Sequence, residues 1–280
     1  MGSSGGPPPL SLSILGVEPM DEFIKEIADW VHFQIMNAPP DLLQGKGGKI
    51  EVEAKVGLLR DTRTSQRLML PVLVESIIAP EYAKGDMRFE SNMSMQQHKH
   101  FNLRLNDLKL SSSQPGFPAS PLGYMHLRLT DSFYPSEDKE KIRVTKDTNT
   151  QEVVECLRKI RLGDLNIYSP KRAVDWRVSV NIEVPVPHPI GSPTHSRKKD
   201  RLSYTHEEFS IDLTQVTSQT QSGAPELLHE LELEFARPDM LVAAAARRGD
   251  PSLPELERSV FDELIRAFVN NARILVRNAD

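Results

Sequence analysis

Carboxylates occur at every second position in two stretches that lie far apart in the chain. Stretches 50–56 and 230–235 both alternate apolar with charged residues, which predicts strands with one apolar and one charged face. The charged positions are Glu51, Glu53 and Lys55 in the first stretch and Glu230, Glu232 and Glu234 in the second. Carboxylates so placed repel one another by roughly a few kcal/mol per close pair in a partly enclosed site, so we expect positive charge between them.

Other stretches alternate in the same way and add basic residues. In stretch 197–204 one side carries Arg197, Lys199 and Arg201, and the other carries Asp200, Leu202 and Tyr204. The polar face of the predicted strand Trp176–Val184 carries Arg177, Ser179, Asn181 and Glu183, and that of stretch 209–214 carries Ser210, Asp212 and Thr214. At least five strands therefore join an apolar face to a face of acids and bases.

The segregation of these charges predicts both a fold and a chemistry. An open surface does not favour runs of one charge at alternate positions, whereas a closed barrel with a polar lumen does. Carboxylates with no histidine or cysteine nearby suit a hard divalent cation, magnesium or manganese. A wall of arginine and lysine suits phosphate oxygens, so the sequence predicts a clamp that prepares a polyphosphate for attack by water.

The remaining elements are predicted from periodicity. Apolar spacing predicts helices over 21–36, 90–110 and 152–160 and a long amphipathic helix over 253–275, while short strands begin near Tyr124 and include 142–144. The glycine-rich stretch 45–49 lacks the Walker spacing and is expected to be a turn. His98 and His100 fall on different faces of their helix, so we expect no metal site there.

Length and composition favour one domain. With 280 residues, 39% of them hydrophobic, and no long polar linker, we expect a flexible leader over 1–20 and a single domain over 21–280. The net charge of −5 gives no overall attraction to nucleic acid. The single cysteine, Cys156, excludes an intramolecular disulfide and a cysteine-rich zinc site, and the absence of a long apolar run predicts an intracellular protein without a membrane span.

Several of these stretches together resemble a known family. Glu51-Val52-Glu53-Ala54-Lys55 fits the E-x-E-x-K signature of the triphosphate tunnel metalloenzymes, and alternating glutamates on a late strand are that group's other mark. Stretches 175–187, 199–204, 211–216 and 230–234 are similar, in the same order, to tunnel strands of the fungal RNA 5′-triphosphatases of messenger RNA capping. The resemblance covers roughly residues 20–280.

The resemblance implies a mainly β (α+β) fold: a closed eight-stranded antiparallel β-barrel with helices packed outside. It also implies metal-dependent removal of the γ-phosphate from 5′-triphosphate RNA, which leaves a diphosphate end, together with hydrolysis of nucleoside triphosphates in the presence of manganese.

The implied Mg²⁺ or Mn²⁺ ligands are Glu51, Glu53 and Glu234. The implied phosphate contacts are Arg143, Lys199 and Arg201, with Lys55, Arg177, Arg197 and Thr214 as further candidates. Glu183 would position the attacking water, and Asp212, Glu230 and Glu232 would support metal waters and basic side chains.

Two points of detail stay open at this stage. Asp131 resembles another tunnel acid, but it alternates with Leu129 and not with its polar neighbours Arg128 and His126, which a β-bulge could reconcile. Trp30, Trp176 and Tyr204 are expected in the core or at the rim, and not as platforms that stack a base.

The resemblance further implies a nuclear homodimer that works with an mRNA guanylyltransferase. The family's segment for that partner lies ahead of the catalytic domain and has no counterpart in the Gly-Pro leader, so we expect a trimmed catalytic domain. Two alternatives remain: a tunnel enzyme acting on inorganic triphosphate or polyphosphate, and a non-catalytic barrel that binds an anion. An ATP cyclase would need a pocket for a nucleobase, which the sequence does not display.

Overall fold

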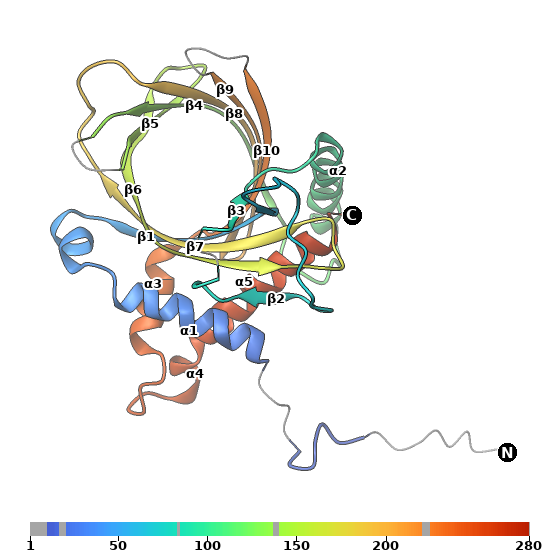
Figure 1. Ribbon diagram of the computed structural model, residues 1–280. Coiled ribbons are helices and arrows are strands. Elements are labelled where there is room, and N and C mark those ends of the chain that lie inside the picture. Colours follow the sequence, from blue (N-terminus) through green and yellow to red (C-terminus); the bar gives the residue numbers. More distant parts are fainter. Residues whose placement is uncertain (1–9, 17–20, 83–84, 137–139, 220–224, 280) are drawn as a thin grey trace.

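A closed barrel of eight antiparallel strands dominates the computed structural model, which describes residues 10–16, 21–82, 85–136, 140–219 and 225–279 (Figure 1). The barrel strands are β1 (Lys49–Asp61), β4 (Gly123–Tyr134), β5 (Ile142–Asp147), β6 (Val153–Tyr168), β7 (Asp175–Pro185), β8 (His195–His206), β9 (Phe209–Gln219) and β10 (Glu226–Phe235). Their order around the wall is β10-β9-β8-β4-β5-β6-β7-β1, and pairing of β10 with β1 closes the ring. The predicted barrel is thereby confirmed.

Closure brings the two acidic stretches side by side. In the β1–β10 pair Glu53 faces Glu234 and Lys55 faces Glu232, while on the other side of β1 the partner of Glu51 is Asn181. Since side chains alternate between the two faces of a strand, all of these point to the same side of the sheet. The strands that carry the carboxylates are therefore neighbours, although almost the whole chain separates them.

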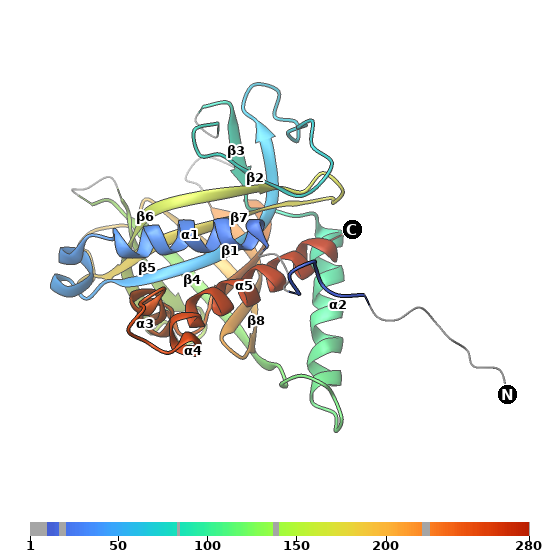
Figure 2. The same ribbon diagram turned by 90° about the horizontal axis from the view of Figure 1, so that it is seen from below.

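The apolar faces of these strands pack against helices outside the barrel. The helices α1 (Glu22–Met36), α3 (Pro238–Arg247) and α5 (Val260–Arg277) lie together beneath β1, β7 and β10 (Figures 1 and 2). Trp176, Val178, Val180 and Ile182 alternate along β7 and are fully buried in this layer. Phe268 of α5 stacks on Phe235 with ring centroids 5.0 Å apart. The helical layer thus holds the acidic wall from behind.

Two short strands lie outside the ring. β2 (Ser76–Ile78) pairs with β6, and β3 (Met87–Glu90) pairs with the far end of β1. The end of β3 lies so close to β1 that a Cβ atom at Gly57 would be 2.1 Å from the Glu90 carbonyl oxygen, so this position needs glycine. The helix α2 (Met95–Ser112) follows and contacts β9 and β10, and Figure 1 shows it beside β10.

One predicted element was wrong. Stretch 152–160 is not a helix packed outside the sheet but the first half of β6, which pairs with both β5 and β7. The spacing of Val153, Val154 and Leu157 fits a helix by coincidence, and pairing on both sides overrides such a weak local preference.

Other boundaries shifted for local reasons. α2 begins at Met95 and not at Glu90, because Ser94 and Gln97 form a capping box and Glu90 belongs to β3. The long helix over 253–275 is divided into α4 (Glu255–Arg258) and α5. α3 and the short π-helix η1 (Asp41–Gly45) were not predicted, and the predicted turn over 45–49 overlaps η1 at Gly45.

Two findings concern the ends and the surface of the chain. Within the described ranges, no helix is long and apolar enough to cross a membrane. Much of the predicted leader, residues 1–9 and 17–20, lies outside the described residues. Leu10, Leu12, Ile14 and Leu15, which belong to the described part, are exposed.

Phe268→Ala tests whether the helical layer stabilises the barrel. Phe268 is fully buried between Phe235 and Phe209, so its removal should lower the free energy of unfolding by about 3–5 kcal/mol. Ile274→Ala on the same helix, where the side chain is 55% exposed, should change it by less than about 0.5 kcal/mol. Urea unfolding followed by circular dichroism measures both, and equal losses would contradict this role for Phe268.

Candidate active site in the barrel lumen

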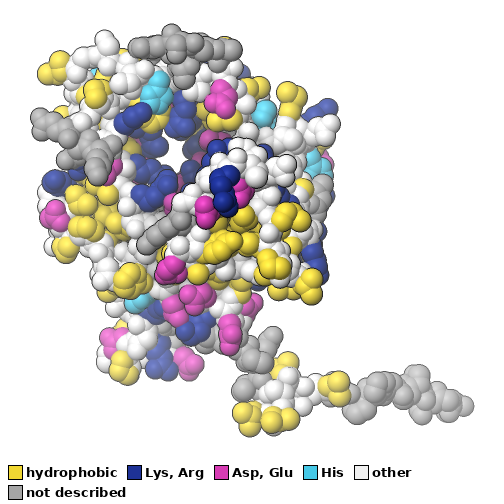
Figure 3. Space-filling model, in the orientation of Figure 1, with side chains coloured by type: hydrophobic (Ala, Val, Ile, Leu, Met, Phe, Trp, Pro, Cys, Tyr) yellow, Lys and Arg dark blue, Asp and Glu magenta, His cyan; other side chains and the backbone are white. Residues whose placement is uncertain are grey.

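The charged faces of the strands enclose a cavity of about 220 Å³ inside the barrel. Figure 3 looks into this opening, and its wall shows both basic and acidic side chains. The lining residues are Glu51, Glu53, Lys55, Leu129, Arg143, Thr145, Glu155, Lys159, Glu183, Arg197, Lys199, Arg201, Glu230, Glu232 and Glu234. Seven are glutamates and six are lysines or arginines, and Leu129 is the one apolar member of this set. Eleven of the fourteen predicted site residues are among them, and the other three are Arg177, Asp212 and Thr214.

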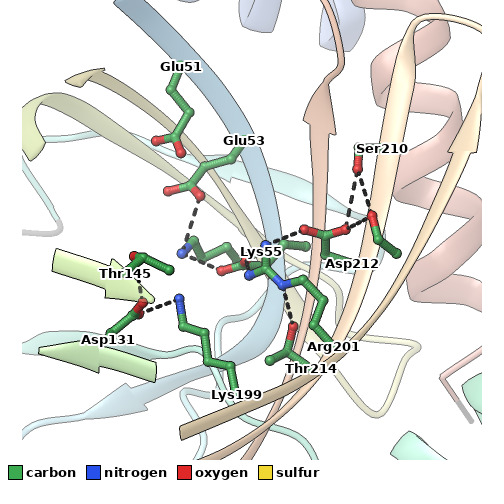
Figure 4. A network of polar contacts seen from close by, with 12 residues as sticks. Glu51, Glu53, Lys55, Asp131, Thr145, Lys199, Arg201, Ser210, Asp212 and Thr214 are labelled. Carbon is green, nitrogen blue, oxygen red and sulfur yellow. Dashed lines mark hydrogen bonds and ion pairs between the residues drawn. The ribbon is translucent and has the colours of Figure 1, made fainter. Parts of the chain in front are cut away.

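Lysines tie the acidic strands together (Figure 4). The ammonium group of Lys55 lies 2.6 Å from a carboxylate oxygen of Glu232 and 3.3 Å from one of Glu53. Lys159 on β6 lies 2.5 Å from Glu51 and 3.2 Å from Glu53. These contacts supply part of the positive charge that the repelling carboxylates require.

Glu230 and Glu234 differ from the other glutamates of the lumen, because neither forms an ion pair among the described residues. Burial and the carboxylate of Glu232 raise the pKa of Glu230, and burial, together with the nearby carboxylates of Glu51 and Glu232, raises the pKa of Glu234 well above the usual range. Burial also disfavours the charged form of Glu232, but Lys55 and Arg201 outweigh it and lower that pKa. Glu230, Glu232 and Glu234 lie at alternate positions of one strand, so the difference comes from their partners.

Glu51, Glu53 and Glu234 can provide oxygen ligands to one cation. One carboxylate oxygen from each lies within 4.8 Å of the others, and all three side chains line the cavity. Asp212, Glu232 and Glu234 form a second such group, but Asp212 does not line the cavity and Arg201 already pairs with both Asp212 and Glu232. The first group has all three carboxylates on the cavity wall, and its all-oxygen donor set fits a hard divalent cation.

The basic side chains are held by acids of their own. Lys199 lies 2.6 Å from Asp131, and Arg201 lies 2.5 Å from Asp212 and donates from Nε to Thr214 Oγ1 at 3.0 Å. Each cation is thereby fixed in position before any anion arrives.

Arg143 is held in the same manner between Glu155 and Glu183, through an Nη2 atom 2.9 and 3.2 Å from their carboxylates. Burial, together with the carboxylate of Glu51, raises the pKa of Glu183 to about 7, although Arg143 and Lys159 oppose that rise.

Several buried polar atoms of the lumen have no hydrogen-bond partner among the described residues. They include the Nε atoms of Arg143 and Arg197 and the Oδ1 atom of Asn181. A buried donor without an acceptor costs free energy, and an anion between the two arginines would supply that acceptor.

Asp131 points into the lumen without any bulge. It is fully buried, accepts from Thr145 Oγ1 at 2.8 Å, and lies in an unshifted β4–β8 register. The assumption that His126 and Arg128 mark the lumenal face was wrong: His126 pairs with Asp200 on the outer face, whereas Leu129 lines the cavity. Polar side chains lie on both faces of this strand, so their alternation did not identify the lumenal one.

Thr214 and Arg177 are the predicted phosphate contacts that do not line the cavity. Thr214 is fully buried and accepts from Arg201. Arg177 has partners outside the cavity. Its Nε atom donates to Asn166 at 2.8 Å, an Nη atom lies 3.2 Å from Asp164, and its guanidinium lies 4.7 Å from the Phe89 ring centroid. The register places it opposite Lys55 and beyond the acidic group.

Lys159 and Glu155 were missed because they lie in the stretch taken for a helix. Read as a strand, 155–159 puts Glu155, Leu157 and Lys159 on one face, which is the signal that would have identified them. Trp176 and Tyr204 are fully buried, as expected for core residues.

Comparisons with known proteins agree with this geometry. The family described as "mRNA capping enzyme, beta chain" matches residues 17–280. The chain is 34% identical to the mRNA-capping enzyme subunit beta of Schizosaccharomyces pombe, over 96% of this chain and 86% of the relative. It is 32% identical to the Cryptococcus neoformans subunit, over 98% of this chain but 66% of that relative. The solved S. pombe Pct1 RNA triphosphatase superposes with a TM-score of 0.84 at 33% identity, over 97% of this chain and 98% of that one.

Glu234→Gln tests the proposed cation site by a measurement other than activity. The change removes the negative charge of Glu234, which burial and neighbouring carboxylates disfavour. Without metal, the free energy of unfolding of the variant should therefore equal or exceed that of the unchanged protein. Mn²⁺ at one hundred times its dissociation constant should stabilise the unchanged protein by about 2.7 kcal/mol, and the variant far less. Thermal unfolding with and without Mn²⁺ measures this, with the exposed Glu226→Gln on the same strand as control. Equal Mn²⁺ stabilisation of the variant and the unchanged protein would remove Glu234 from the site.

Proposed function

Since the chain belongs to the mRNA capping enzyme β-chain family, we propose that it hydrolyses the γ-phosphate of 5′-triphosphate RNA, the first step of messenger RNA capping. The observation that carries the proposal is a closed lumen in which Glu51, Glu53 and Glu234 face a set of arginines and lysines. A triphosphate end is linear and multiply charged, so it fits a narrow tunnel that it enters end-on. The product is an RNA with a 5′-diphosphate end.

The basic residues bind the phosphates. Arg143, Lys199 and Arg201 come from β5 and β8, and each is already oriented by an acid. Guanidinium groups can bind two phosphate oxygens at once, whereas lysine acts as a point charge. Lys159 was not predicted from the sequence, but it joins this set because its ammonium group lies between Glu51 and Glu53 on the cavity wall.

The carboxylates bind the cation and orient the water. Glu51, Glu53 and Glu234 would hold Mg²⁺ or Mn²⁺, which when bound polarises the terminal phosphorus and offsets the charge that develops on its oxygens. Glu183, held by Arg143, would accept a hydrogen bond from the attacking water. Asp212 and Glu232 would keep Arg201 in place, and Glu230 would support the basic side chains near Lys55 and Arg197.

A role in capping also implies protein partners and a subcellular localisation. We propose an mRNA guanylyltransferase that accepts the diphosphate end, action in the nucleus, and a homodimer. The S. pombe Pct1 RNA triphosphatase has been solved in complex with the Spt5 CTD, which shows that a related tunnel protein binds a further factor.

Phosphate release from three substrates tests the proposed function. With Mn²⁺ the protein should release phosphate from 5′-triphosphate RNA and from ATP, and Glu51→Ala should abolish release because it removes a cation ligand. Glu226→Ala, an exposed glutamate on β10, should retain activity. Release from tripolyphosphate with none from RNA would favour an inorganic triphosphatase, and no release from any substrate would favour an anion-binding barrel.

Arg201→Lys tests whether the fork of the guanidinium matters as well as its charge. Arg201 contacts Asp212, Glu232 and Thr214 simultaneously, which a single ammonium group cannot reproduce. We expect kcat with triphosphate RNA to fall at least tenfold, which is about 1.4 kcal/mol in transition-state stabilisation. The exposed Arg266→Lys on α5 is the control, and wild-type kinetics for Arg201→Lys would exclude a direct role.

A further inference from the structure

Two aromatic side chains lie on the lumenal face at the end of the basic wall. On β4, Phe133 follows Leu129 and Asp131 at alternate positions, and both of those point into the lumen. On β8, His195 precedes Arg197 and Lys199 at alternate positions, and both of those line the cavity. Because side chains alternate along strands, Phe133 and His195 lie on the same inner face.

These rings form an ordered stack with a guanidinium. Phe133 and His195 are direct partners in the β4–β8 register, and their rings are parallel within 3° with centroids 4.4 Å apart. The Arg197 guanidinium lies 4.7 Å from the Phe133 ring centroid. Both rings are half-buried, so the stack is not part of the core that holds Trp176 and Tyr204.

The stack is at one mouth of the lumen, at the end of β1 that lies beyond Lys55. The charges of Lys55 and Arg197 both act on Glu230, so these three side chains share one level of the barrel. The next lumenal positions outward are Gly57 on β1 and His195 on β8, and His195 is the first residue of its strand. The rings therefore lie at the rim, directly outside the cavity.

The opposite mouth is acidic. Glu183 pairs in register with Lys49 at the start of β1, and the charges of Glu51 and Glu155 act on it. Arg143 and Lys159 offset part of this negative charge, but the three carboxylates make this mouth less favourable than the basic one for a phosphodiester chain.

The proposed reaction assigns a direction to the lumen. In-line transfer places the attacking water and the leaving group on opposite sides of the phosphorus. If Glu183 orients the water near the acidic mouth, the rest of the RNA leaves through the other mouth. Arg197, whose Nε atom has no partner in the described structure, then lies beside the phosphate nearest to the first nucleoside.

We propose that the Phe133–His195 stack is the binding site for the base of the first RNA nucleotide, an inference that rests on the proposed function of the tunnel. The flat face of any base can continue the stack, so the site selects a nucleotide end without selecting its sequence. Burial and the charges of Lys141 and Arg197 lower the pKa of His195, which leaves the imidazole neutral at neutral pH.

Matched substrates separate this role from phosphate binding. His195→Ala should lower kcat/KM for a short 5′-triphosphate RNA about tenfold, or about 1.4 kcal/mol, and leave tripolyphosphate hydrolysis unchanged. His195→Phe, which keeps a ring, should restore RNA hydrolysis. Tyr124→Leu, an aromatic position on the outer face of β4, should behave as the unchanged protein.

An RNA that lacks its first base tests the contact from the other side. The unchanged protein should process this abasic substrate about tenfold less well, and His195→Ala should cause no further loss with it, because both changes remove one contact.

Each other result overturns the proposal. One such result is a loss of about a hundredfold in kcat/KM when His195→Ala acts on the abasic RNA. Others are an equal loss with tripolyphosphate and a failure of His195→Phe to restore RNA hydrolysis. Any of these would show that the rings act only through Arg197 or the fold. If the unchanged protein released no phosphate from any RNA, the proposed function itself would fail, and that result is distinct from a variant effect.

Discussion

Thirteen ionisable side chains share one lumen of about 220 Å³, and the arrangement of the lumen depends on keeping their charges balanced. Lys55 holds Glu53 and Glu232, Lys159 holds Glu51 and Glu53, and Arg143 holds Glu155 and Glu183. Removing one partner would leave a buried charge uncompensated. The free-energy cost of that unpaired charge is larger than the stabilisation that the intact pair provides. Glu230 and Glu234 form no ion pair among the described residues, and a divalent cation would neutralise the charge at Glu234.

This interior needs an unusual exterior. In most small barrels the inside is the apolar core, but here the apolar faces of β1, β7 and β10 point outward and require another layer to cover them. The helices α1, α3 and α5 provide that layer, with Phe268 and Trp176 fully buried within it. The strands β4 and β8 show the alternative, because their outer face carries polar pairs such as His126 and Asp200. The barrel can therefore have a polar lumen only because the helices cover the apolar outer faces of these strands.

The sequence predicted the parts of the fold where alternation is strict and the charges have one sign. β1, β7, β8 and β10 were found in this way, whereas the three cation ligands now proposed came from the resemblance of β1 and β10 to strands of a known family. It failed at 152–160, where Val153, Val154 and Leu157 imitate helical spacing and only pairing with β5 and β7 settles the conformation. It also failed to orient β4, because polar and charged residues lie on both faces of that strand and did not show which face points into the lumen. Which acid meets which base depends on the stagger of the closed barrel, which no local pattern contains.

The lining of the cavity decides what part of a substrate can enter it. Leu129 is the one apolar side chain in that lining, so the lumen offers phosphates many partners and a base almost none. A nucleotide end must therefore divide between two environments, with its phosphates among the arginines and its base outside them. Phe133 and His195 provide an aromatic surface at that boundary, one lumenal position beyond Arg197. The same alternation that fills the lumen with charge places these rings where the charge ends.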